Sequence, residues 1–372
     1  MNRTKTRPLV VAHADCDLYH SSYVTTGLCR LADAGRIDLK FRLPAAVFAR
    51  HRGRFTVRLD VHDQPGGEPR KVCVDLHDQN DYFANASLRD CGLYFKRSYN
   101  REEIAKLPPE LAAKVLPFGP TFGCRPWRER GLASRWAGSL LSHTQRIGGW
   151  RTLSRHDGLR SLYDFAPQSS YRALRPLGEY ERGRLIEPEP RVYLNTRLFP
   201  EESEQVAALN RRRIELVRRL RAELGPRFLG GLIPGELVPA DCRTNAPADR
   251  RAHVENLNSS LVCVYTNGLH DSVAWKLGEY MAAARCVVGE PLCNELAGPL
   301  TGGAGVFFSA STDECVAACL RLVADPELAF ETRRGIAAYY ASFVRPDDNL
   351  WRVVSRAPAA TEMAWAGSAA LA

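Results

Sequence analysis

The residues whose types and spacing best suit ligand binding or catalysis lie in one run, NSSLVCVYTNGLHDSVAWKLGEYMAAARCVVGEPL, residues 258–292. An apolar strand expected at Leu261–Tyr265 leads into a polar loop, and Asp271 and Ser272 then stand where a helix N-cap belongs. The start of a helix offers free backbone N–H groups and the positive end of a dipole, which both favour a phosphate group. We therefore predict that a phosphate-bearing ligand binds at the start of a helix over Ser272–Arg285.

Lys276 and Glu279 fall on one face of this expected helix, in its first turns. A lysine in that place would neutralise a diphosphate as a point charge, and a carboxylate would accept hydrogen bonds from ribose hydroxyls. The two residues together would suit a nucleotide sugar. The same spacing also occurs in ordinary ion pairs on exposed helices, so spacing alone leaves both interpretations open.

The segment resembles the donor-binding signature of GT-B glycosyltransferases, in which two acidic residues with seven positions between them precede the apolar run A-M-A-A-G-x-P-V-V. Here seven residues separate Asp271 from Glu279, and YMAAARCVV follows at residues 280–288. The resemblance implies that Glu279 binds the ribose and that Asp271 contacts the transferred sugar. Asp271 replaces the usual Glu, and Ala-Arg-Cys replaces Gly-x-Pro. The order Asp-Ser, Lys, Glu is also similar to exostosin-like and fucosyltransferase donor motifs, in which a basic residue at the Lys276 position holds the diphosphate.

Two further segments resemble parts of bacterial glycosyltransferases. VYLNTRLFPEE, residues 192–202, looks like the strand and G-R-L opening of a GT-B donor domain, which implies that Arg197 contacts the diphosphate. A surface ion pair of Arg197 is the simpler alternative. GIAAYYASFVRPDDNLWRVV, residues 335–354, resembles the end of such enzymes. The resemblance covers residues 190–355 well and the first half only in architecture.

The first half supplies candidates for the acceptor side. The loop HADCDLYHSS, residues 13–22, holds Asp15, Asp17 and His20, any of which could act as the base in an inverting transfer or face the donor sugar in a retaining one. Local turn or capping roles are the alternative. Asp-Cys-Asp could also hold a divalent metal, but it follows the first strand of the chain, so we predict no metal site.

Two later strands of the first half also end in polar side chains. DLHDQNDYF, residues 75–83, places three aspartates and a histidine after a strand, and LYFKRSY, residues 93–99, places a lysine and an arginine after the next. These side chains would line the same cleft as acceptor or phosphate contacts, or would be ordinary surface charges.

Short apolar runs alternate with helix-like segments, a pattern that predicts an α/β protein with two Rossmann-like domains facing a cleft, the GT-B architecture. The expected domains are an acceptor-side domain with a linker region at 1–188, a nucleotide-sugar donor domain at 189–345, and a C-terminal segment with a frayed tail at 346–372. In the linker region, about Arg125–Arg191, glycines and prolines interrupt any long element, and only some local helix is expected. The expected strands are Leu9–Ala12, Leu39–Arg42, Val72–Leu76, Leu93–Phe95, Val115–Phe118, Val192–Asn195, Arg227–Leu232, Leu261–Tyr265, Cys286–Gly289 and Val306–Ser309. The expected helices are Ser22–Ala34, Ser203–Leu224, Ser272–Arg285, Thr312–Ala324 and Pro326–Ser342.

Composition narrows the class of protein. The chain has 372 residues, of which 45% are hydrophobic and 25% charged, which excludes a disordered or collagen-like chain. No window has the roughly 18 consecutive apolar residues of a membrane-spanning helix, and the run Leu9–Ala12 is too short for a signal peptide. Eleven scattered cysteines indicate neither a zinc site nor a disulfide framework, so we expect a cytoplasmic protein with buried thiols.

The net charge of +9 is concentrated in Ser203–Leu224, where six arginines interleave with apolar residues at helical spacing. This pattern indicates either the solvated face of an amphipathic helix or a peripheral contact with an anionic membrane at its inner face. No recognition-helix, aromatic-stacking or zinc-finger signature is present, so nucleic acid is not an expected partner.

These observations predict a metal-independent glycosyltransferase, hexosyltransferase or fucosyltransferase-like, that needs no cofactor besides its donor substrate. It would transfer a sugar from a nucleotide-diphosphate sugar to a saccharide or lipid-linked glycoconjugate acceptor, in bacterial surface polysaccharide biosynthesis. The residues expected to bind the donor are Arg197, Ser272, Lys276 and Glu279, and the expected catalytic candidates are Asp15, Asp17, His20 and Asp271. Two alternatives remain: a sugar-nucleotide epimerase on the same fold, and a non-enzymatic basic protein that binds nucleic acid or a membrane surface.

Overall fold

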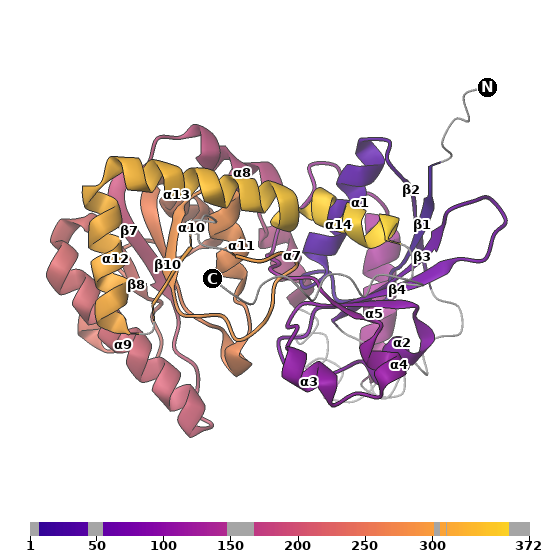
Figure 1. Cartoon of the computed structure of the whole chain (residues 1–372), viewed down its shortest axis with the longest axis horizontal. Coiled ribbons are helices and arrows are strands. Elements are labelled where there is room, and N and C mark those ends of the chain that lie inside the picture. The colour runs from indigo at the N-terminus through magenta and orange to yellow at the C-terminus, as the bar shows by residue number, and fades with distance from the viewer. Residues whose placement is uncertain (1–6, 44–54, 147–166, 301–305, 310, 357–372) are drawn as a thin grey trace, which may run out of the picture.

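The chain folds around two β-sheets flanked by helices (Figure 1). The computed structural model describes residues 7–43, 55–146, 167–300, 306–309 and 311–356. One sheet has six strands in the order β2-β1-β3-β4-β5-β6, and the other has five in the order β11-β10-β9-β7-β8. Parallel pairs predominate in both sheets, which confirms the predicted α/β class.

The six-stranded sheet lies in the first half of the chain. Its strands are β1 (Leu9–His13), β2 (Asp38–Arg42), β3 (Thr56–His62), β4 (Arg70–Asp75), β5 (Leu93–Lys96) and β6 (Val115–Pro117). β3 is antiparallel to both β1 and β4, and it was not expected from the sequence. Its polar residues Arg58 and Asp60 interrupt the apolar pattern because they pair with Asp15 and His13 across the sheet.

The region expected to be a linker with some local helix, residues 125–191, contains several helices in its described part. They are α5 (Leu132–Arg146), α7 (Pro167–Ala173) and α8 (Leu177–Glu181), followed by a 3-10 turn at Arg182–Leu185. The helices before them are α1 (Ser22–Asp33), α2 (Asn85–Asp90), α3 (Arg101–Ala105) and α4 (Pro109–Ala112). Pro167 and Pro176 stand at or just before the starts of α7 and α8, where a proline separates one helix from the next.

The five-stranded sheet is parallel throughout, and its strands read as continuous apolar runs because helices cover both faces. Its strands are β7 (Glu189–Thr196), β8 (Phe228–Leu232), β9 (Ser260–Tyr265), β10 (Cys286–Gly289) and β11 (Val306–Phe308). The helices are α9 (Glu204–Leu224), α10 (Arg250–Ser259), α11 (Trp275–Ala282), α12 (Thr312–Ala324) and α13 (Pro326–Tyr339). All five strands were expected, whereas α10 was not.

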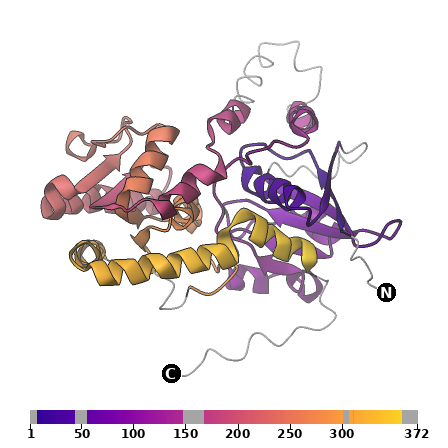
Figure 2. The same cartoon turned by 90° about the horizontal axis from the view of Figure 1, so that it is seen from above.

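The end of the described chain returns to the first half. After α13, a π-helical turn at Tyr340–Val344 leads into α14 (Pro346–Ser355), which packs against α1 (Figures 1 and 2). Asn349 donates its side-chain N–H groups to the Tyr23 hydroxyl at 3.0 Å and to the Phe118 carbonyl at 3.1 Å. A single apolar cluster includes residues from both sheets. The chain therefore passes from the second sheet back to the first near residue 345, and the predicted domain boundaries stay a prediction.

None of the helices in the described ranges is long and apolar enough to cross a membrane. All eleven cysteines lie within those ranges as free thiols, and all but Cys293 are buried.

Candidate functional site

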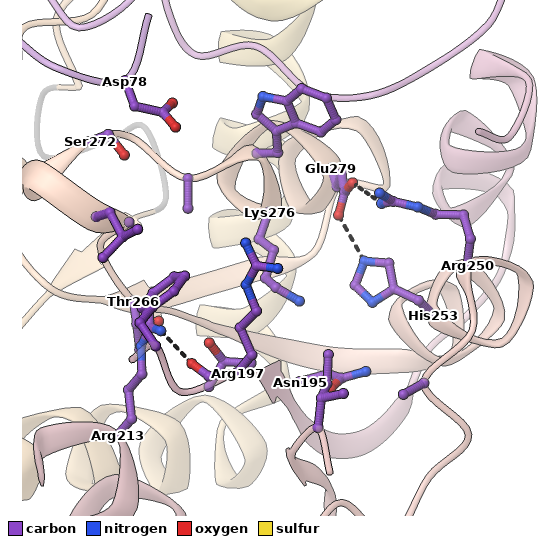
Figure 3. Close-up of a pocket in the computed structure, with 18 of the residues that line it drawn as sticks. Asp78, Asn195, Arg197, Arg213, Arg250, His253, Thr266, Ser272, Lys276 and Glu279 are labelled. Carbon is purple, nitrogen blue, oxygen red and sulfur yellow. Dashed lines mark hydrogen bonds and ion pairs between the residues drawn. The ribbon is translucent and has the colours of Figure 1, made fainter. Parts of the chain in front are cut away.

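A cleft of about 420 Å³ lies between the carboxyl ends of the second sheet and the loops that follow β1, β4 and β5 of the first. Open parallel sheets commonly bind ligands at this edge. The first half contributes Tyr19, His20, Asp78 and Arg97. The second half contributes mainly polar side chains, all of them labelled in Figure 3 except Thr196: Asn195, Thr196, Arg197, Arg213, Arg250, His253, Thr266, Ser272, Lys276 and Glu279.

Arg213 is a buried cation at the wall of the cleft, with 3% of its surface exposed. It extends from α9 and donates to the backbone carbonyls of Arg197 at 2.5 Å and Asn267 at 2.6 Å, which follow β7 and β9. It has no carboxylate partner in the described part of the chain. Burial, only partly offset by Glu290, lowers its pKa to about 10, so it stays charged at neutral pH. The sequence had suggested a solvated position.

Arg197 is exposed at the end of β7, and its guanidinium lies 5.0 Å from the ring centre of Phe199. Arg213 lies at the same distance from that ring. No carboxylate within the described ranges pairs with Arg197, so its charge is open to the cleft, and its predicted contact with a diphosphate stays a prediction. The cleft therefore carries one fixed and one exposed arginine on the same wall.

Lys276 is the second residue of α11 and projects into the cleft (Figure 3). Its ammonium makes neither a hydrogen bond nor an ion pair with any residue that the structure describes. Burial lowers its pKa to about 8; Glu279 opposes this effect, while Arg250, Arg213 and Arg197 add to it. Together with the two arginines, Lys276 gives this wall three positive charges without an acidic partner among the described residues.

Glu279 is 1% exposed and is held by two residues of α10 (Figure 3). Arg250 donates to one carboxylate oxygen at 2.7 Å, and His253 Nε2 lies 2.7 Å from the other. Burial favours the neutral acid, but Arg250 and His253 outweigh it and lower the pKa of Glu279 to about 2. Burial also lowers the pKa of His253 despite the nearby Glu279, so the imidazole is neutral at pH 7.

Arg250 and His253 were missed by the sequence analysis because α10 was not expected. The signal was present: Asp249 caps the helix by accepting the backbone N–H groups of Arg251 at 3.0 Å and Ala252 at 3.1 Å. The cap places Arg250 at the first helical position and His253 one turn later on the same face. Arg250 also donates to the Tyr19 hydroxyl at 3.2 Å, which links the two halves across the cleft.

Asp271 and Ser272 do not cap α11, which begins three residues later with Ala274 as its N-cap. His270 and Asp271 adopt left-handed backbone conformations with φ of 57° and 52°, so the chain turns before it can enter the helix. Ser272 lines the cleft. The Asp271 carboxylate accepts from Gln205 of α9 at 2.9 Å and is not among the cleft-lining residues, so its predicted contact with the transferred sugar stays a prediction.

His20 and Asp17 form a pair beside the cleft. Asp17 Oδ1 lies 2.9 Å from His20 Nδ1 and also accepts the His20 backbone N–H at 2.9 Å. In the tautomer that donates from Nδ1 to Asp17, Nε2 carries the free lone pair, and no residue of the described ranges bonds to it. Asp15 instead pairs with Arg58 at 2.5 Å and does not line the cleft.

Further contacts besides the Arg250–Tyr19 hydrogen bond join the two halves. Arg97 pairs with Asp78 and donates to the Val273 carbonyl of the second half at 2.7 Å. Arg101 forms two parallel hydrogen bonds with Glu295, at 2.9 and 3.0 Å. These contacts fix the position of the first half, which carries His20 and Asp17, relative to the wall that carries Arg197, Arg213 and Lys276.

Within the ranges that the structure describes, no three His, Cys, Asp or Glu side chains are grouped to hold a metal ion. Many of the arginines of α9 have acidic partners: Arg211 pairs with Glu204, Arg212 with Glu290, Arg218 with Asp241 and Arg219 with Asp313. The predicted membrane contact of this helix stays a prediction.

Comparison with known proteins gives no family. No family model matches the sequence, and no curated protein matches it. One solved structure that the chain resembles is described as the glycotransferase of kitacinnamycin, with 13% identity and a TM-score of 0.34 over 93% of this chain and 99% of that one. A likeness this distant does not assign a function.

Proposed function

We propose that this protein is a glycosyltransferase that moves a sugar from a nucleotide-diphosphate sugar to a hydroxyl of a saccharide or lipid-linked acceptor. The observation that carries the proposal is the pairing of two features in one cleft. One wall holds three cations without acidic partners in the described chain, Arg197, Arg213 and Lys276, and the other side holds the imidazole of His20 backed by Asp17.

The cations suit the donor side of the reaction. When the bond between the sugar and the diphosphate breaks, negative charge grows on the leaving phosphate oxygen. Preorganised cations in a partly buried cleft stabilise that charge without reorganising. Arg213 is fixed by two backbone carbonyls, while Arg197 and Lys276 are free to close on the phosphates. This arrangement would allow the diphosphate to depart without a metal ion.

His20 suits the acceptor side as a general base. In the proposed step the acceptor oxygen attacks the anomeric carbon as the carbon–diphosphate oxygen bond breaks, and the acceptor proton passes to His20 Nε2. Asp17 then stabilises the imidazolium, which is the usual role of a carboxylate behind a catalytic histidine. This scheme inverts the anomeric configuration and assigns no step to Asp15 or Asp271.

Glu279 fits the ribose of the donor. A carboxylate has about four acceptor positions, and Arg250 and His253 use two of them. Because Glu279 is ionised and lines the cleft, its remaining lone pairs are available to ribose hydroxyls. The expected setting, surface-polysaccharide synthesis at the cytoplasmic face of a bacterial membrane, belongs to this proposal and rests on the sequence resemblance.

A thermal-shift screen tests the donor assignment. We expect one of UDP, GDP, ADP or TDP to raise the melting temperature with or without Mg²⁺, because a ligand that binds only the folded state stabilises it. Lys276→Met should reduce the shift, whereas Lys114→Met, at a half-buried lysine of the first half outside the cleft, should leave it unchanged. If no nucleotide stabilises the wild-type protein, the proposal fails.

His20→Gln separates chemistry from binding. We expect this variant to keep the wild-type thermal shift with the nucleotide and to lose about 10²–10⁴-fold in sugar transfer, the usual contribution of a general base. Transfer is measured as release of the nucleoside diphosphate in the presence of acceptor. Unchanged turnover in His20→Gln would show that His20 is not the general base. Conversion of the donor sugar in the absence of any acceptor would favour an epimerase.

A further inference from the structure

A series of ring contacts runs from the cleft to the surface of the first half. His20 lies 5.9 Å from Trp275 and 4.4 Å from Phe55, measured between ring centres. Phe55 in turn lies 5.1 Å from His77, and His77 lies 4.3 Å from Tyr82, which is 42% exposed. We call Phe55, His77 and Tyr82 the ring strip; none of the three lines the cleft itself.

The ring strip is held from below by a buried polar network. His77 Nδ1 lies 2.6 Å from Asp75 Oδ1, and the fully buried Asp75 also accepts from the Tyr94 hydroxyl at 2.6 Å and from Lys96 at 3.2 Å. Burial opposes ionisation of Asp75, but Lys96 and His77 keep its pKa below the ordinary value. A buried ion pair stabilises little in net terms, and its best-attested use is to fix one arrangement.

That network fixes the loop of the ring strip as well as its histidine. Lys96, which is itself fully buried, donates to the backbone carbonyls of Gln79 at 3.1 Å and Tyr82 at 2.6 Å. His77 therefore resembles His20 in having a carboxylate on Nδ1, and no residue in the described ranges bonds to its Nε2. Two oriented imidazoles thus contact the same phenyl ring, one beside the cleft and one outside it.

We propose that the ring strip is an acceptor subsite that binds a second ring of the acceptor, next to the unit whose hydroxyl faces His20. The flat face of that ring stacks on Tyr82, and one of its polar substituents bonds to His77 Nε2. Exposed aromatic faces bind flat apolar faces, and an oriented imidazole adds direction. The acceptor is therefore at least two linked units long. This inference rests on the proposed function, because it takes His20 as the site of transfer.

The second ring could be a pyranose or an aryl group, because both present a flat face with polar substituents. Two probes distinguish them: methyl β-cellobioside carries two sugar rings, and 4-nitrophenyl β-glucoside carries an aryl ring beside a sugar. Methyl β-glucoside, with one ring, is the reference. Binding is measured by calorimetry on the full chain, both alone and with the diphosphate that gives the largest thermal shift.

We expect at least one two-ring probe to bind more tightly than methyl β-glucoside and to lose about tenfold in affinity in Tyr82→Ala, a typical effect for one lost stacking contact. His77→Gln should weaken the same probe. Phe330→Ala, at an aromatic ring that is 59% exposed on α13, is the matched control and should change nothing. Because Tyr82 is exposed, its truncation should leave the melting temperature close to that of the wild type.

Two results overturn the subsite: neither two-ring probe binds more tightly than the one-ring reference, or Tyr82→Ala binds the probes as well as the wild type does. The nucleotide shift separates this failure from failure of the proposed function. A wild-type shift with no effect of Tyr82 rejects the subsite alone, whereas loss of any nucleotide shift rejects donor binding whatever the probes do.

Discussion

The ammonium of Lys276 lies in the cleft, and its pKa is shifted toward neutrality. Burial lowers its pKa to about 8, Glu279 limits the fall, and three arginines around the cleft deepen it. A lysine of this kind changes charge over a pH range in which the surrounding arginines do not. The number of positive charges that meet a bound diphosphate therefore depends on pH.

We expect the affinity for the stabilising nucleoside diphosphate to fall as pH rises from 7.5 to 9.5. Lys276 is charged below a pH of about 8 and neutral above it, while a phosphate with a second pKa near about 6 is already fully ionised in this range. Lys276→Arg stays charged throughout and should flatten the profile. Calorimetry at several pH values measures the affinity. An affinity of the wild type that does not change with pH would contradict the charge assigned to Lys276.

Glu279 is expected to stabilise the fold in a pH-dependent way. Its folded pKa of about 2 lies below the ordinary 4.5, so its contribution is complete above pH 4.5 and is lost as pH falls toward 2. At pH 7, Glu279→Gln should be less stable by on the order of 3 kcal/mol, because Arg250 loses its buried partner. Urea unfolding at pH 7 and pH 3.5 should show a smaller difference at the lower pH.

The matched control for Glu279 is Glu255→Gln. Glu255 lies on α10 and pairs with Arg251 at 2.8 Å, but both side chains are exposed. An exposed pair of this kind contributes about 0–1 kcal/mol. An equal loss in both variants, or a loss at Glu279 that does not change with pH, would show that the carboxylate is not the source of the stabilisation.

At the scale of elements, the sequence predicts best where periodicity alone decides the structure. The strand Cys286–Gly289 and the helix Thr312–Ala324 have the expected bounds, since the strand is a continuous apolar run and the helix keeps its apolar residues at helical spacing. β3 was missed because Arg58 and Asp60 are polar residues with partners across the sheet. The start of α11 was placed three residues early, because two successive left-handed residues are a backbone choice that side-chain types do not reveal.

The candidate site likewise contains residues that local sequence predicts and residues that only tertiary contacts bring together. The cleft is lined by Arg197, His20 and Ser272, from loops that follow strands, and by Lys276 and Glu279, from the first turns of α11. Arg213 was assigned to a solvated face, because an arginine held by two carbonyls instead of a carboxylate leaves no signal in the local sequence. Arg250 and His253 meet Glu279 only through the packing of α10 beside α11, and one sequence without homologues cannot show that contact.

The N-terminal cap of α10 should affect both the stability of the protein and nucleotide binding in the cleft. Asp249→Ala removes the acceptor for two backbone N–H groups and should lower the free energy of unfolding by about 1 kcal/mol. It should also weaken nucleotide binding, because Arg250 is the next residue. Ser311→Ala removes the cap of α12 and should lower stability similarly while leaving binding unchanged. If Asp249→Ala and Ser311→Ala bind the nucleotide equally well, the cap of α10 does not contribute to nucleotide binding.

At the scale of the whole molecule, the packing of α14 on α1 depends on one small residue. A Cβ built at Gly27 would lie 2.4 Å from the Pro346 carbonyl oxygen, which cannot move aside as a flexible side chain could. We expect Gly27→Val to lower the free energy of unfolding by about 1–3 kcal/mol, as overpacking does. Gly178→Ala, where the added Cβ would meet nothing within 4 Å, should be neutral or slightly stabilising.

Urea unfolding followed by circular dichroism and by tryptophan fluorescence measures both glycine variants. If Gly27→Val is as stable as Gly178→Ala, the helix that returns to the first half does not contribute to holding the two sheets together.

The cationic wall also has a consequence for the empty protein. Arg197, Arg213 and Lys276 repel one another when no anion is bound, and each arginine lowers the pKa of Lys276. Self-repulsion of this kind makes the ligand-free fold less stable than its packing would permit, and a bound anion relieves it. A chain selected for folding alone would replace one of these cations with a neutral side chain. A chain that keeps all three cations is less stable but binds an anion without rearrangement. The most stable variants of this protein should therefore also be among its poorest binders.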